Sequence, residues 1–245
     1  MIGAVVLAIA AAFVLGVGGG VSATKAERPL PFSPSHWWPA DGTADDAVGD
    51  DDGQLLNGTT FAPGLSGQAF RFDGQGAEVR FDAIGGNFER NPFTLAFFIR
   101  TTSLAKMAIW EKRPVCNAAS FWEFRMSNGG VAEAALMSDE FGNDFTWGFS
   151  SGTFVGDGAW HHIALVRDGT TAIIYVDGSP VASATTPQPS LLRNDTPMRA
   201  GMSACTFVDG TLPFEGDLDE LLIYDHALHR GQIQALIHRF LRTKR

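Results

Sequence analysis

Short runs of β-branched and aromatic residues, separated by Gly, Asn, Asp and Pro, recur along the chain from residue 36 onward. Two of them, Trp160–Arg167 and Thr171–Val176, are each followed by an Asp-Gly pair, and a third short run, Pro180–Ser183, comes after the second pair. Asp-Gly tolerates the positive φ angles that tight hairpin turns require. This stretch therefore predicts an antiparallel meander.

Further runs of the same kind cover much of the chain up to residue 224. They predict strands at Gln68–Phe72, Glu78–Phe81, Phe93–Thr101, Ala108–Lys112, Phe121–Met126, Val131–Leu136, Phe145–Phe149, Met198–Gly201 and Leu218–Tyr224. Phe93–Ile99 is almost continuously apolar, as expected of a strand that is covered on both faces. Many short strands at this spacing predict an all-β sandwich or barrel.

Only the C-terminal tail has a helical pattern. Its apolar residues follow a partial helical spacing at Leu228, Ile233, Leu236, Ile237 and Phe240. Basic side chains gather at its end, at Arg239, Arg242, Lys244 and Arg245. We expect residues 229–245 to form a short basic helix and tail.

The N-terminal segment is a hydrophobic leader without a charged side chain in its first 24 residues. Ile2–Val17 is almost wholly apolar, and Val21–Ala23 fits the small-x-small pattern of a signal-peptidase site, although no Lys or Arg precedes the apolar run. We expect residues 1–23 to be a helical signal peptide, with an uncleaved membrane anchor or the interior of a longer product as alternatives. Residues 24–35 contain three prolines and predict an extended linker.

Composition limits the possible partners. The chain has 245 residues and a formal net charge of −9, which argues against a phosphate-binding groove for nucleic acid. Acidic side chains gather at residues 45–46 and 50–52, where a solvated loop or a cation site is expected. Cys116 and Cys205 form an even pair, which in an exported chain favours a disulfide, with two buried thiols as the alternative.

An ordered set of motifs resembles the laminin-G-like domains of the concanavalin A-like lectin/glucanase superfamily. The motifs are Trp37–Gly42, Phe61–Gly64, Gly67–Phe70, Phe72–Gly74, Asp157–His162, Tyr175–Gly178, Gly216–Glu220 and Ile223–Leu228. Glu111–Arg113, Cys116, Phe121-Trp122 and the Ser203-x-Cys205 pair further resemble a bacterial secreted branch of that family. No single motif is specific, but their order is.

The resemblance implies a two-sheet antiparallel jelly-roll sandwich over residues 36–228, with the first and last strands side by side. It also implies a Cys116–Cys205 disulfide. Many members of the family carry one Ca²⁺, which takes six to eight oxygen ligands. If the first and last strands are neighbours, Asp41, Asp46 and Asp219 are the candidate ligands.

One segment allows an enzymatic alternative. Residues 215–220 fit the pattern E-x-D-x-x-E of laminarinase-like glycoside hydrolases, with Glu215 and Glu220 as the two catalytic carboxylates and Asp217 as helper. In a regular strand Glu215 and Glu220 point to opposite faces, and a β-bulge would bring Glu220 to the same face. The same residues fit the non-catalytic G-x-L-D-E pattern that the laminin-G resemblance predicts.

The sequence therefore predicts an exported, non-enzymatic binding or adhesion module, secreted or held at the cell surface. Its expected partner is an extracellular polysaccharide or a glycosylated or protein surface, bound by loops at one rim, and one Ca²⁺ is expected to assist. Tryptophan side chains could stack on sugars, although a core of this size also needs large aromatics. A glycoside hydrolase and a structural envelope or filament-associated protein are the alternatives.

Overall fold

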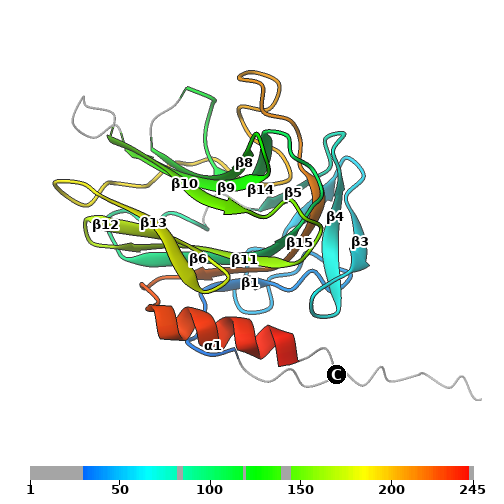
Figure 1. Cartoon of the computed structure of the whole chain (residues 1–245), viewed down its shortest axis with the longest axis horizontal. Coiled ribbons are helices and arrows are strands. Elements are labelled where there is room, and N and C mark those ends of the chain that lie inside the picture. The colour runs from blue at the N-terminus through cyan, green and yellow to red at the C-terminus, as the bar shows by residue number, and fades with distance from the viewer. Residues whose placement is uncertain (1–29, 82–84, 118–119, 139–144, 243–245) are drawn as a thin grey trace, which may run out of the picture.

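The computed structural model describes residues 30–81, 85–117, 120–138 and 145–242, with the backbone alone for 145–147. Two antiparallel sheets stack face to face in these residues, and one helix lies outside the sandwich (Figure 1). This architecture confirms the predicted all-β jelly-roll class.

The first sheet runs in the order β13-β12-β11-β6-β15-β4-β3, and β1 pairs with β15. The strands are β1 (His36–Trp38), β3 (Thr60–Pro63), β4 (Gln68–Asp73), β6 (Phe93–Arg100), β11 (His161–Asp168), β12 (Thr171–Val176), β13 (Ser179–Thr185) and β15 (Glu215–Tyr224). The predicted meander is β11-β12-β13. The first and last strands lie side by side, as the resemblance implied, with Trp38 opposite Leu221.

The second sheet runs in the order β10-β9-β8-β7-β14-β5-β2. Its strands are β2 (Gln54–Leu56), β5 (Glu78–Phe81), β7 (Met107–Lys112), β8 (Phe121–Ser127), β9 (Val131–Ser138), β10 (Phe145–Phe154) and β14 (Met198–Ala200). Its inner face packs on the first sheet around buried aromatic side chains, which include Trp38, Phe97, Trp110, Trp122 and Phe124.

The helix α1 (Arg230–Leu241) covers the outer face of the first sheet (Figure 1). Ile233, Leu236 and Phe240 are buried on its sheet-facing side, where they form a second apolar cluster with β6, β11 and β15. Both faces of β6 are therefore covered, which explains its continuous apolar run. Leu30 and Phe32, from the predicted linker, also pack against this cluster.

The predicted leader, residues 1–23, lies outside the described residues. Among the helices that the structure does describe, none combines the length and the apolar character needed to cross a bilayer.

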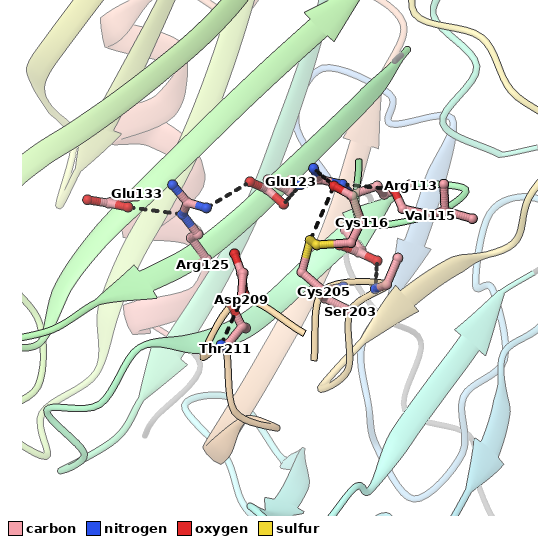
Figure 2. Close-up of polar contacts among 12 residues, drawn as sticks. Arg113, Val115, Cys116, Glu123, Arg125, Glu133, Ser203, Cys205, Asp209 and Thr211 are labelled. Atoms are coloured by element: carbon pink, nitrogen blue, oxygen red, sulfur yellow. Dashed lines mark hydrogen bonds and ion pairs between the residues drawn. A yellow bond between two sulfur atoms is a disulfide. The ribbon is translucent and has the colours of Figure 1, made fainter. Parts of the chain in front are cut away.

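The predicted disulfide is present and joins the middle of the β7–β8 connection to the loop between β14 and β15. Cys116 and Cys205 lie 4.5 Å apart between their Cα atoms. Beside them, Arg113 contacts the carbonyl of Cys116 and pairs with Glu123 at 2.7 Å. Figure 2 shows the chain of ion pairs continuing through Arg125 to Glu133 across the outer face of the second sheet. These contacts tie the Cys116 end of the bridge to β8.

Candidate functional site

A β-bulge in β15 brings two acidic residues to the outer side of the first sheet. The register against β6 shifts between Asp219 and Leu222, and Glu220 adopts a left-handed conformation with φ 53°. Asp219 is fully buried, and its Oδ2 accepts hydrogen bonds from the backbone N–H groups of Leu65 (2.7 Å) and Ser66 (3.2 Å). Asp219 therefore holds the turn between β3 and β4.

Asp41 reaches the same turn from the other side. Its Oδ1 accepts a hydrogen bond from the backbone N–H of Gln68 at 2.7 Å. Gly67 has φ 68°, and a Cβ on it would collide with the Asp41 carboxylate. A Cβ on Gly64 would lie 2.6 Å from Asp219 Oδ2. Glycines at these two positions let the turn close around both carboxylates.

One oxygen of the Asp219 carboxyl group lacks a hydrogen-bond partner in the part of the chain that the structure describes. Its Oδ1 is buried and has no hydrogen-bond partner among the described residues. Burial is the main cause that raises the pKa of Asp219 well above its usual range, and the negative charge of nearby Asp41 raises it further. The hydrogen bonds from Leu65 and Ser66 lower this pKa but do not offset the effect of burial. A buried carboxylate beside a second one fits a hard cation, which would satisfy both and take further carbonyl oxygens.

Asp46, the third candidate ligand, is not brought to this turn. One of its oxygens accepts from the backbone N–H groups of Trp37 (3.0 Å) and Gly49 (2.9 Å), and the other lies 2.6 Å from His36 Nδ1. The His36 and backbone hydrogen bonds outweigh desolvation and lower the pKa of Asp46. Asp46 thus organises the acidic loop after β1.

A cavity of about 440 Å³ opens on the first sheet at the start of β15. Its lining comes from the ends of β4 and β6, the start of β15 and the loop before β11, namely Arg71, Phe72, Asp73, Arg100, Thr101, Thr102, Gly158, Glu215, Gly216 and Asp217. These strand ends meet because neighbouring strands run antiparallel.

Asp217 orders the polar floor of the cavity. This buried carboxylate forms ion pairs with two arginines on the neighbouring strands. Arg71 lies opposite it on β4, and Arg100 lies opposite it on β6 at 2.7 Å. Arg100 also donates to the Pro63 carbonyl at 2.9 Å and lies 4.6 Å above the Trp160 ring centroid. Both arginines are thereby held rigidly while part of each stays exposed. The Arg100–Pro63 bond links the cavity to the turn that Asp219 holds.

The structure separates the two glutamates of the hydrolase pattern. Glu215 is exposed and lines the cavity. Glu220 is 2% exposed, is absent from the cavity lining, and accepts a 2.5 Å hydrogen bond from Trp37 Nε1. Hydrolysis needs two carboxylates that flank one open site. The bulge brings Glu220 to the outer face, but its carboxylate is buried against β1.

Most of the tryptophans that could have stacked on sugars are core residues. Trp37, Trp38, Trp110 and Trp122 are buried, and the side chain of Trp147 is not described. Trp160 is partly exposed and supports Arg100. Sequence reasoning missed Arg71 and Arg100, because only strand register reveals that both face Asp217.

One known protein shows partial sequence similarity to this chain. Over 153 residues the chain is 27% identical to the basement membrane-specific heparan sulfate proteoglycan core protein of Mus musculus, a match that covers 56% of this chain and 4% of that protein. The chain therefore spans only a small part of this relative.

Solved structures of low sequence identity share the fold. The binding domain of Paraclostridial Mosquitocidal Protein 1 has a TM-score of 0.66 at 15% identity, over 82% of this chain and 51% of that one. Domain 4 of AbnA, a GH43 extracellular arabinanase from Geobacillus stearothermophilus solved with arabinotriose, has a TM-score of 0.60 at 17% identity, over 83% and 98%. The binding domain of Botulinum Neurotoxin DC in complex with SialylT has a TM-score of 0.65 at 12% identity, over 86% and 52%.

The family comparison covers most of the sandwich. The laminin-G model of the concanavalin A-like lectin/glucanases superfamily matches residues 73–234, from the end of β4 into α1. The chain belongs to the concanavalin A-like lectin/glucanases superfamily, as a laminin-G-like domain.

Proposed function

We propose that this domain is a non-enzymatic module that binds a neutral glycan in the cavity at Arg71 and Arg100. The observation that carries the proposal is the pair of guanidinium groups that Asp217 holds in place beside the exposed carboxylate of Glu215. Sugar hydroxyls both donate and accept hydrogen bonds, so a rigid site with donors and acceptors side by side suits them.

Charge favours a neutral ligand over an anionic one. The cavity lining contains two arginines, Arg71 and Arg100, and three acidic residues, Asp73, Glu215 and Asp217. An anionic sugar would have to overcome this balance. The arabinanase domain whose structure contains arabinotriose has the same fold, which supports the proposal by analogy.

The buried environment of Glu220 supports a non-enzymatic role. A glycoside hydrolase of the laminarinase type would need Glu215 and Glu220 at one substrate. Glu220 is instead buried against Trp37, and Asp217 is occupied by two arginines. Binding without hydrolysis is therefore the function that this lining supports best.

We further propose that one Ca²⁺ binds between Asp41 and Asp219, with carbonyl oxygens of the β3–β4 turn completing its coordination. The buried Asp219 Oδ1 without a hydrogen-bond partner supports this assignment. The ion would stiffen the turn whose Pro63 carbonyl accepts from Arg100, and so would help to hold the cavity wall. Asp46 is not included in this proposed site, because its contacts are with His36 and the backbone of its own loop and not with the β3–β4 turn.

Export fits this role, with residues 1–23 acting as a signal peptide or anchor that places the module outside the cytoplasm. There it would meet extracellular polysaccharide or a glycosylated surface. N-terminal sequencing of the mature chain tests this, since a start at Thr24 means cleavage.

A glycan array that includes arabinan, β-glucan and sialylated glycans tests the proposed function. Wild-type protein with calcium is compared with Arg71→Ala, and with Arg80→Ala as matched control. Arg80 is a similarly exposed arginine that pairs with Glu78 on the second sheet. We expect retention on neutral glycans that Arg71→Ala loses and Arg80→Ala keeps. An array without signal for the wild type, or equal signals for both variants, would contradict the proposal.

A further inference from the structure

Phe154 is an exposed aromatic residue at the end of β10, and its ring lies against two glycines. Its side chain is 48% exposed, whereas the neighbouring Val155 is buried in the core. A Cβ on Gly130 would lie 2.7 Å from Phe154 Cε2, and one on Gly156 would lie 3.2 Å from the same atom. Two glycines thus leave room for the ring against the main chain, and its exposed part faces solvent.

An apolar neighbour completes this surface. The Cβ position at Gly130 also lies 3.1 Å from Leu104 Cδ2, so Leu104 and Phe154 lie on the same side of this backbone. Leu104 is 54% exposed. Gly130 has φ 76° and stands in the turn between β8 and β9, where a side chain would be strained and would displace the ring.

Two backbone contacts connect this aromatic surface to the lining of the cavity. Gly158 and Thr101 both line the cavity, and the Gly158 N–H donates to the Thr101 carbonyl at 2.9 Å. The same two segments also approach each other two residues away from this bond, at Gly156 and Ser103. A Cβ on Gly156 would lie 2.9 Å from the Ser103 carbonyl oxygen. Two residues of extended chain span roughly 7 Å. The connection from β6 to β7 therefore leads directly from the cavity to Leu104 and Phe154.

We propose that Phe154, flanked by Leu104, is a stacking subsite that extends the cavity, so that the domain binds an oligosaccharide chain rather than a single terminal sugar. This inference rests on the proposed function. The aromatic face takes the apolar face of a sugar ring one or two units away from the unit in the cavity.

Size and surroundings favour a sugar over a protein at this position. A stable protein interface buries roughly 800 Å² per partner, far more than two exposed side chains provide. A ring positioned by backbone loses little conformational freedom on binding, which favours a small ligand with few contacts.

Titration calorimetry with oligomers of one, three and six units tests the subsite. The probes are the α-1,5-arabinan and laminarin series, measured with wild type, Phe154→Ala and Phe154→Trp. Phe207→Ala is the matched control, because Phe207 is a 71% exposed phenylalanine on a different loop, the one that contains Cys205. Thermal unfolding of each variant verifies that it is folded.

We expect wild-type affinity to rise from monomer to hexamer. Phe154→Ala should lower hexamer affinity roughly five- to tenfold without changing monomer affinity. Phe154→Trp should keep the gain with length, and Phe207→Ala should match the wild type.

Two results would overturn the inference. Equal hexamer affinity in Phe154→Ala and wild type would show that Phe154 is not a subsite. It would not affect the proposal of binding in the cavity, which Arg71→Ala tests separately. Failure of the wild type to bind any glycan would overturn the proposed function and this inference together.

Discussion

Asp219 is a buried carboxyl group, and its Oδ1 has no hydrogen-bond partner among the described residues. Because burial raises its folded-state pKa, the folded protein holds the carboxyl proton more tightly than the unfolded chain does. This contribution to stability is complete below the ordinary carboxyl pKa of about 4 and is lost as pH rises through the raised pKa. The metal-free protein should therefore lose stability toward neutral pH, where a bound cation would restore it.

We predict that calcium raises the Tm at neutral pH and that Asp219→Asn abolishes this response. At 100 times its Kd a ligand adds about 2.7 kcal/mol, or roughly 5–10 °C for a domain of this size. Thermal unfolding between pH 4 and 8, with calcium or with chelator, measures it.

Asp46→Asn is the control for this prediction. It should lower the Tm, because it weakens the hydrogen bonds to His36 and the acidic loop, yet keep the calcium response. A wild-type Tm that is the same with calcium and chelator at every pH would rule out the ion.

At the residue scale, the family resemblance suggested Asp41, Asp46 and Asp219 as calcium ligands, and of these Asp41 and Asp219 meet at the β3–β4 turn. Nothing local in the sequence identified the cavity arginines. Arg71 and Arg100 belong to strands that flank β15 on opposite sides, and both meet Asp217 only because of the register. Phe154 was missed because its proposed role depends on its contacts with Gly130 and Gly156, and the folded structure is needed to bring Gly130 next to it.

At the scale of elements, buried strands such as the short β5 and β14 were predictable, whereas the short, exposed strands β2 and β3 were not. Phe93–Arg100 and the β11–β13 meander were predicted to within one or two residues at most ends. The strands β2 and β3 have three and four residues and are largely exposed, so they leave little periodic signal. The bulge at Glu220 could be anticipated only as a possibility.

The helix α1 should contribute to stability through its sheet-facing side. We predict that Leu236→Ala lowers the free energy of unfolding by about 2–5 kcal/mol, because Leu236 is fully buried against the first sheet. Leu241→Ala, at a 46% exposed position of the same helix, should change it by less than about 0.5 kcal/mol. Urea unfolding of both variants measures this, and equal effects would show that α1 does not pack as described.

The disulfide should stabilise the fold without shaping the cavity. The bridge links residues 89 apart in sequence, and neither cysteine lines the cavity. We predict that replacing Cys116 and Cys205 together by Ala lowers the free energy of unfolding by about 2–5 kcal/mol and leaves glycan affinity unchanged. Urea unfolding and calorimetry measure the two quantities, and a large loss of affinity would show that the loop after Cys205 takes part in binding.

At the scale of the whole molecule, the faces of the two sheets are used mainly for packing, and the proposed binding residues lie at strand ends and loops. The inner faces form the aromatic core, and α1 covers the outer face of the first sheet. The cavity, the Asp41–Asp219 turn and Phe154 all belong to loops and strand ends. The sequence led us to expect a sandwich core with binding loops at its rim, since sandwich scaffolds carry function on their loops. It could not indicate which loops meet, because tertiary contacts determine that.

Chemical-shift mapping tests the central claim, glycan binding at this cavity, most directly. ¹⁵N-labelled protein with calcium is titrated with the best-retained neutral oligosaccharide from the array. We predict that the largest amide shifts fall on Thr101, Thr102, Gly158 and Gly216, which line the cavity. Shifts concentrated on the outer face of the second sheet, or no shifts at saturating ligand, would contradict the account.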